Sequence, residues 1–201
     1  MHKLRFLLVF LSSMHLVLAQ VTVALRNQGF PLTLNHWYAQ PNGDSVFLSE
    51  FKFYLVLPSD STFLVDASEP ASLHLPYFSI DDETVLLRIG MDSSMNTCGR
   101  LDGAYDPLLG MYWAWNTGYT QLKCKGIYQI AGKHIPFEYH LGGYKYPYAT
   151  SLQKWIRLEQ NTLGIQLDSL LTHLPVLDQP RMMLPGPMAR ALFVRFTEGF
   201  Q

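Results

Sequence analysis

The stretch GMYWAWNTGY, residues 110–119, decides the fold because it concentrates large aromatic side chains between turn-forming residues. It contains two of the four tryptophans and two of the eleven tyrosines. In an extended chain alternate side chains point to one face of a sheet, so Trp113 and Trp115 would share a face. Pro107 precedes the stretch and Gly118 lies near its end, which disfavours a helix. These residues predict a central strand, continuing to residue 123, that anchors a β-core.

Short apolar runs separated by turn residues extend this pattern along the chain. Residues 46–57 (VFLSEFKFYLVL) mix polar with aromatic and aliphatic side chains, which is typical of a strand with one strongly buried face. Pro187 favours the start of a terminal helix over residues 187–198. We therefore predict one all-β domain, a β-sandwich of about 8–10 short, mostly antiparallel strands with a C-terminal helix. The other expected elements are strands 21–25, 32–38, 63–66, 72–76 and 84–89, hairpins 127–131 with 135–141 and 155–158 with 163–167, and a helical turn at 168–174.

Residues 1–19 have the features of a secretory signal peptide: a short basic start, an apolar run and a small-residue ending. We expect cleavage between Ala19 and Gln20, and a secreted or periplasmic domain of residues 20–201. The apolar run is too short to span a membrane. Without Lys3 and Arg5, the 15 Lys and Arg become 13 against 16 Asp and Glu, a formal charge of −3. Nucleic acid is not an expected partner, because a phosphate-binding surface needs a basic excess.

Cys98 and Cys124 are the two cysteines of the chain, and both follow the expected cleavage site. Outside the cytosol a disulfide between them is chemically permitted. It would join the loop that enters the predicted central strand to the end of that strand. Sequence does not establish that the two Cα atoms lie within bonding range. A Cys98–Cys124 disulfide and two buried free thiols are therefore both open alternatives.

Four segments, taken in order, resemble landmarks of the MbnP-like family of secreted copper-associated proteins. The segments are 48–55 (LSEFKFYL), 89–96 (IGMD followed by MN), 110–119 and 137–143 (FEYHLGG). Order and spacing agree over roughly residues 20–195, which is nearly all of the mature chain. The resemblance implies a β-sandwich fold.

The resemblance also implies copper bound by histidines, with help from a tryptophan oxidised to kynurenine. A di-haem enzyme is the implied partner that makes this modification. Imidazole nitrogen suits copper, and ring opening gives an indole an amine and a carbonyl. The chain departs from the family pattern at Thr97, where a histidine is expected, and at Gly143-Tyr144, where a small residue and a cysteine are expected. Trp113-Ala114-Trp115 replaces the Trp-x-His pair of some copper-binding relatives.

His140, which precedes two glycines at a predicted strand end, is the first candidate copper ligand, since histidine is the commonest metal ligand. His36, beside Trp37 on another predicted strand, is the second. Trp113 and Trp115 are candidate ligands after oxidation. Each candidate has a structural alternative: the histidines as hydrogen-bonded groups at the core edge, and the tryptophans as core anchors.

A second function is open, because Tyr144 to Tyr148 (YKYPY) cluster aromatic residues in a turn. Exposed aromatic residues mark contacts, so this loop could engage a protein or glycan partner without any metal. The departures from the family pattern favour this interaction module. The chain contains no nucleophile-elbow, zinc-protease or phosphate-loop motif, and we expect it not to be an enzyme.

Overall fold

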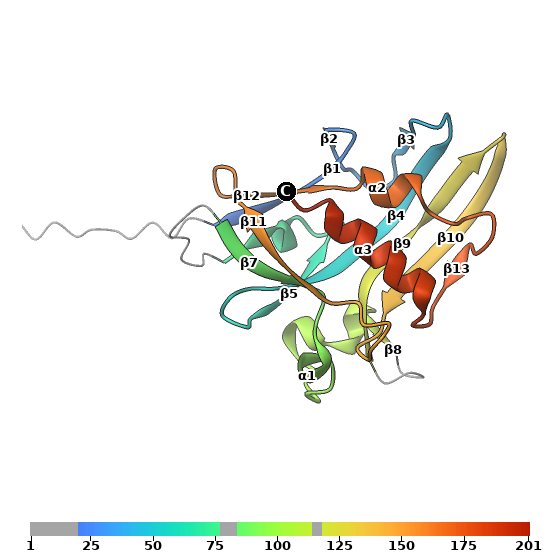
Figure 1. The fold of residues 1–201 in the computed structure, drawn as a ribbon. Helices are drawn as coiled ribbons and strands as arrows, with labels where there is room; N and C mark the ends of the chain where they lie inside the picture. The colour runs from blue at the N-terminus through green and yellow to red at the C-terminus, as the bar shows by residue number, and fades with distance from the viewer. Residues whose placement is uncertain (1–19, 77–83, 114–117) are drawn as a thin grey trace, which may run out of the picture.

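The computed structural model describes residues 20–76, 84–113 and 118–201 (Figure 1). The predicted signal peptide and Trp115 lie outside the described residues. Within these ranges the chain forms two β-sheets, three α-helices and three short 3-10 helices. The prediction of an all-β fold with a C-terminal helix is confirmed. The described residues form thirteen strands, several of them only two residues long.

The larger sheet has nine strands. They are β3 (Trp37–Ala39), β4 (Ser45–Val56), β5 (Thr62–Asp66), β7 (Thr84–Ile89), β8 (Tyr112–Trp113), β9 (Gly118–Ile130), β10 (Lys133–Gly142), β11 (Leu152–Arg157) and β13 (Arg181–Met182). The main path runs β11-β7-β4-β9-β10-β13, while β3 and β5 also pair with β4, and β8 pairs with β9. The β10–β13 pair is parallel, and the remaining pairs are antiparallel.

The smaller sheet joins the two ends of the chain. It contains β1 (Val21–Asn27), β2 (Phe30–Pro31), β6 (His74–Leu75) and β12 (Thr162–Gln166). β1 pairs with β12 in parallel and with β2 and β6 in antiparallel fashion. Side chains of β1 and β12 belong to the same hydrophobic core as those of the larger sheet. The two sheets therefore share one apolar interior.

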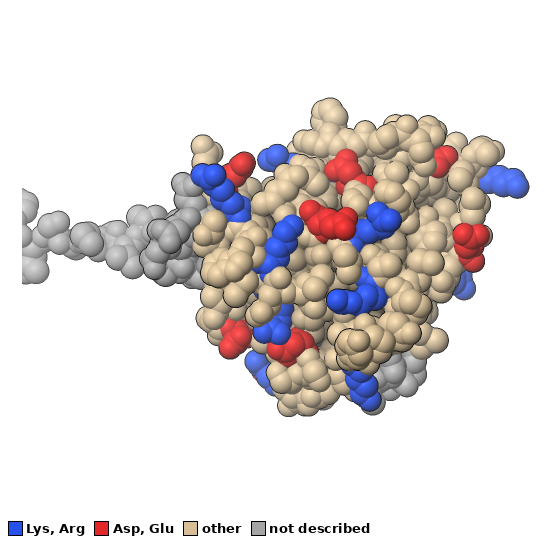
Figure 2. All heavy atoms as spheres, in the orientation of Figure 1, with Lys and Arg blue, Asp and Glu red and all other residues tan. Residues whose placement is uncertain are grey.

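Helix α3 (Pro187–Glu198) lies across one face of the larger sheet, over β4, β9 and β10 (Figure 1). Its predicted range is confirmed, with Pro187 in its first turn. Figure 2 shows Lys and Arg mixed with Asp and Glu on this face of the molecule. The other helices are short: α1 (Ser93–Asn96), α2 (Asp168–Thr172), and the 3-10 helices η1 (Pro70–Leu73), η2 (Gly103–Tyr105) and η3 (Pro107–Leu109).

Around Lys52, alternation along β4 separates a face packed in the main core from a face that carries charged side chains. Phe51 and Phe53 of β4 are fully buried in the main core. The ring of Phe196 in α3 packs against them, with centroid distances of 5.8 and 5.0 Å. Between them Lys52 points to the other face, where it stands opposite Lys123 of β9. Burying these aromatic rings against α3 stabilises the apolar side of the sheet.

The prediction that residues 110–119 belong to one continuous central strand is wrong. The stretch is divided between β8 and the start of β9, with Tyr112 opposite Tyr119 and Trp113 opposite Gly118. β9 itself holds the central position, between β4 and β10. A run that is apolar on both faces does not distinguish one long strand from two paired ones, which explains the error. The predicted burial of Trp113 is confirmed, since it is 2% exposed.

The predicted hairpin of residues 155–158 with 163–167 is also wrong. β11 pairs with β7, and β12 pairs with β1, so the two segments lie in different sheets. Long-range pairing with apolar strands overrides the short connection between them. The strand expected over residues 32–38 is shorter than predicted, because Asn35 has a φ of 60° and β3 begins at Trp37.

Gly126 in β9 provides a test of this packing. A Cβ at this position would lie 1.9 Å from the carbonyl oxygen of Phe47, next to the β-bulge of β4 at Ser49. We expect Gly126→Ala to lower the free energy of unfolding by about 1–3 kcal/mol, because β4 and β9 must move apart. Urea denaturation of the mature domain measures this change. Gly164→Ala in β12 is the matched control, since nothing lies within 4 Å of its Cβ; equal midpoints for the two variants would contradict the described packing.

Candidate functional site: an aromatic pocket beside a charged sheet face

An aromatic pocket of about 320 Å³ lies where β8, the start of β9 and the loop after β10 meet. Its lining comes from distant parts of the chain: Trp113 of β8, Gly118 and Tyr119 of β9, residues 143–148, and Pro185 before α3. Trp113 therefore borders the pocket as well as the core. This pocket includes the whole loop that was predicted as a recognition surface.

Two consecutive glycines allow the pocket to form. A Cβ at Gly142 would lie 2.8 Å from two ring carbons of Trp113, and a Cβ at Gly143 would lie 2.8 Å from the carbonyl oxygen of Tyr148. Both distances are too short for van der Waals contact, so a larger residue would displace the indole or the loop. Gly143 also has a φ of +131°, which L side chains rarely adopt. The departure from the family pattern at Gly143 thus has a structural role here.

The loop after β10 combines a fixed backbone with exposed side chains. The N–H of Tyr148 donates to the carbonyl of Lys145 at 3.0 Å, and the N–H of Thr150 donates to the carbonyl of Gly143 at 2.8 Å. Tyr146 is 96% exposed and Tyr148 is 40% exposed. Tyrosine supplies a large, amphipathic contact area at low conformational cost. The loop therefore presents two tyrosine side chains to solvent from a hydrogen-bonded backbone.

Tyr119 connects the pocket to the loop of residues 93–109. Its hydroxyl lies 2.8 Å from the carbonyl oxygen of Arg100 and 2.9 Å from that of Tyr105. Its backbone N–H donates to Oδ1 of Asn96 at 3.2 Å. Burial raises the pKa of Tyr119 to about 12, so its hydroxyl stays protonated at ordinary pH and remains a donor.

The face of the larger sheet opposite α3 carries a charged lattice. It consists of a row of Asp66, Lys52, Lys123 and His140 on β5, β4, β9 and β10, and a second row of Glu50, Lys125 and Glu138 on β4, β9 and β10. Three carboxylates face three ammonium groups, so the lattice is balanced when the imidazole is neutral. Each side chain is 33% exposed or less.

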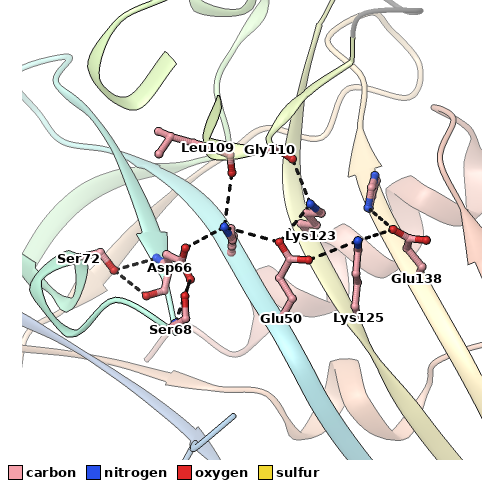
Figure 3. Close-up of polar contacts among 11 residues, drawn as sticks. Glu50, Asp66, Ser68, Ser72, Leu109, Gly110, Lys123, Lys125 and Glu138 are labelled. Atoms are coloured by element: carbon pink, nitrogen blue, oxygen red, sulfur yellow. Dashed lines mark hydrogen bonds and ion pairs between the residues drawn. The ribbon is translucent and has the colours of Figure 1, made fainter. Parts of the chain in front are cut away.

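Glu50 is the centre of the charged lattice (Figure 3). Its carboxylate lies 3.6 Å from Nζ of Lys52, 3.1 Å from Nζ of Lys123 and 3.5 Å from Nζ of Lys125. Lys125 also lies 2.6 Å from the carboxylate of Glu138. Burial alone would raise the pKa of Glu138, but the hydrogen bond and the charge of Lys125, together with His140, outweigh burial and lower this pKa. The carboxylate of Glu138 is therefore held in its charged form.

The segment before β8 covers the charged lattice. Nζ of Lys52 donates to the carbonyl of Leu109 at 3.5 Å, and Nζ of Lys123 donates to the carbonyl of Gly110 at 3.2 Å (Figure 3). Gly110 adopts the left-handed conformation, with a φ of 74°, and ends η3. The chain then continues into β8 and Trp113. The lattice thus fixes the start of the strand that forms one wall of the aromatic pocket.

His140, the first predicted copper ligand, lies within the charged lattice. Its Nε2 is 3.1 Å from Oε1 of Glu138, and its side chain is 12% exposed. Burial lowers the pKa of His140, and the ammonium group of Lys123 lowers it further. The imidazole is therefore neutral at neutral pH, which is the form that binds metals. A bound cation there would face the ammonium groups of Lys123 and Lys125.

The structure does not bring His36 and His140 together. His36 is exposed, and its ring packs edge-on against Tyr38 with centroids 5.0 Å apart. Tyr38 borders the main core, whereas His140 faces the charged side of the sheet. Among the residues that the structure describes, no group of three or more His, Cys, Asp or Glu is arranged to hold a metal ion. Of the two tryptophan candidates, Trp113 lines the aromatic pocket and Trp115 lies outside the described residues.

Both cysteines are free, so the structure contains no Cys98–Cys124 disulfide. Cys124 points from β9 into the main core, and burial raises the pKa of its thiol. Cys98 is exposed in the loop after α1. The bridge is not formed because this loop lies on the charged side of the sheet, opposite to the side that Cys124 faces. The alternative of two buried thiols holds for Cys124 and is wrong for Cys98.

Comparison with protein-family models matches residues 19–176 to MbnP. This match spans more than half of the 201-residue chain, and the protein belongs to the MbnP family. The resemblance read from four sequence segments is thereby confirmed. Comparisons with curated proteins and with solved structures gave no match. In the described ranges, no helix is both long enough and apolar enough to cross a membrane.

The charged lattice was not predicted from the sequence. Its signal is a repeated spacing of two between charged or polar residues in apolar strands: positions 50 and 52, 123 and 125, and 138 and 140. Such spacing places both members of a pair on one face of a strand. The register between strands, which makes the pairs complementary, comes from the structure.

The central position of Glu50 gives a stability prediction. Glu50→Gln would leave three lysines without their shared carboxylate in a largely buried setting, so we expect the free energy of unfolding to fall by about 1–3 kcal/mol. Glu69→Gln at an exposed position is the control, and it should change stability by less than about 0.5 kcal/mol. Urea denaturation of the mature domain compares the two. Indistinguishable midpoints would show that Glu50 does not hold the lattice together.

Proposed function

We propose that this MbnP-family protein is a secreted or periplasmic, non-enzymatic binding protein that engages a protein partner through its aromatic pocket. The observation that carries this proposal is Tyr146, which is 96% exposed on an ordered loop at the edge of the pocket. Large exposed aromatic side chains around a preformed hollow are typical of binding hot spots. The N-terminal segment, residues 1–19, supports the proposed compartment.

The lining of the aromatic pocket favours a polypeptide over a glycan. Its described side chains are those of Trp113, four tyrosines, Lys145 and two prolines, with no Asp, Asn, Glu or Gln among them. A sugar carries many hydroxyl groups, and each one that is buried without a hydrogen bond costs free energy. An apolar or aromatic side chain of a partner protein makes no such demand. The pocket therefore suits a protein ligand better.

Selection from a phage-displayed random peptide library, with the mature domain as bait, tests this proposal alongside a glycan array. We expect selected peptides to bind the wild-type domain at least about tenfold more tightly than the Tyr146→Ala/Tyr148→Ala variant. Trp155→Ala is the control, because Trp155 is 68% exposed on β11 and does not line the pocket. Fluorescence anisotropy with labelled peptides measures the affinities.

Two results would contradict the proposed partner. One is a failure to enrich any peptide that distinguishes the wild-type domain from the double variant. The other is binding of glycans alone, lost in the same variant. Because both tyrosines are exposed, far-ultraviolet circular dichroism should show an unchanged fold.

Copper binding is a second candidate function, favoured by the neutral imidazole of His140 and the carboxylate of Glu138 at 3.1 Å. These two groups are an incomplete set for copper, and the lysines beside them disfavour a cation. A ring-opened Trp113 or Trp115, made by a di-haem partner as in the family pattern, would add an amine and a carbonyl. Copper binding of this kind therefore depends on a modified tryptophan or on donors beyond the described residues.

Copper titration by calorimetry, with protein isolated from its native host, tests this candidate. We expect stoichiometric binding that His140→Ala abolishes and that His74→Ala, at an exposed position, leaves unchanged. Intact mass of the same sample reports whether a tryptophan has been ring-opened. Absence of binding, or binding unaffected by His140→Ala, would remove His140 as a copper ligand.

A further inference from the structure

The aromatic pocket is the middle one of three adjoining pockets. It shares Tyr119 and Tyr144 with a pocket of about 270 Å³ beside α1, which Arg100 also lines. It shares Pro185 with a pocket of about 450 Å³ between β13 and the start of α3, which ends at Met188 and Ala189. Because the aromatic pocket shares lining residues with each of the other two, the three pockets lie side by side, and together they are here named the three-pocket groove.

The three-pocket groove has a local excess of positive charge. Arg100, Lys145 and Arg181 line one pocket each, and no Asp or Glu is among the described residues that line any of them. Nε of Arg100 lies 3.1 Å from Oδ1 of Asp102, which offsets its charge. Lys145 and Arg181, both exposed, therefore carry most of the excess. The whole chain has a formal charge of −1, so this excess belongs to the groove and not to the protein at large.

Exposed apolar side chains accompany these cations along the groove. Leu101 lies at the α1 end, Tyr146 in the middle, and Leu184 and Met188 at the α3 end. Contiguous exposed apolar groups mark an interaction surface. Tyrosine, methionine and arginine are also the residue types that are enriched in protein–protein interfaces. The three-pocket groove therefore combines a large surface, exposed apolar side chains and positive charge.

We infer that the three-pocket groove binds an extended acidic segment of a partner polypeptide. One large apolar or aromatic side chain enters the aromatic pocket, and flanking Asp or Glu side chains face Lys145 and Arg181. An extended chain advances about 3.3 Å per residue with alternate side chains on one face, so such a segment can fill adjoining pockets in turn. Complementary charge raises the association rate and suppresses wrong partners. This inference rests on the proposed function and adds the charge and shape of the ligand.

Two fluorescein-labelled nine-residue peptides test the inference: one has alternating Asp and Glu around a central Trp-Pro pair, and the other has Asn and Gln in their place. We expect the acidic peptide to bind the mature domain at least about tenfold more tightly in 50 mM salt by fluorescence anisotropy. The variant Lys145→Glu/Arg181→Glu should remove this preference. Lys133→Glu, exposed at the far β9–β10 turn, is the matched control and should retain it.

The outcomes separate this inference from the function on which it rests. Equal binding of the two peptides, lost in Tyr146→Ala/Tyr148→Ala, would overturn the acidic ligand and leave protein binding at the pocket intact. Failure of both peptides to bind would also overturn the acidic ligand, while the library selection decides the broader proposal. A heparin oligosaccharide that binds in a manner abolished by Lys145→Glu/Arg181→Glu, without peptide binding, would replace the polypeptide by an anionic glycan.

Discussion

The shared contact of Glu50 with three lysines is the constraint on which the rest of this structure depends. Charged groups that are largely removed from water stabilise a fold only when each has a close partner of opposite sign. Here Glu50 and Lys52 come from β4 and Lys123 and Lys125 come from β9, so this carboxylate ties the register of β4 to that of β9, and the ion pair of Lys125 with Glu138 extends the tie to β10. A shift of one residue would place apolar side chains among the lysines and charges against α3. The burial of apolar side chains on one face and the pairing of charges on the other therefore require the same strand register.

The same constraint positions the candidate site. Ammonium groups of Lys52 and Lys123 use the carbonyl groups of Leu109 and Gly110 as further acceptors, which holds the incoming segment over the sheet. That segment leads into β8 and sets Trp113 against Gly142. A charged network on one side of β9 thus determines where the indole lies. Fold and pocket are consequences of one arrangement of side chains and not two independent features.

Patterns within single segments of the sequence predicted the positions of strands and helices better than they predicted which strands pair. Strand β4 and helix α3 follow from alternation and from Pro187, because these signals lie within one segment. The division of residues 110–119 between two strands, and the pairing of β12 with β1, depend on contacts between distant segments. The Tyr144 to Tyr148 loop was found as an aromatic cluster, yet its pocket needs Trp113 and Pro185, which no local pattern connects. His140 was found as a histidine before two glycines, but its lysine neighbours come from register across strands.

The parallel pairing of β1 with β12 has a consequence for the order in which this protein can assemble. The first described strand needs a partner from near the end of the chain, with Val23 beside Leu163. A nascent chain that has reached the end of β10 lacks both that partner and Phe196, which covers Phe51 and Phe53. Its apolar surface stays open to chaperones until β12 and α3 have been synthesised, because long-range contacts form late. Closure of the interior therefore waits for β12 and α3.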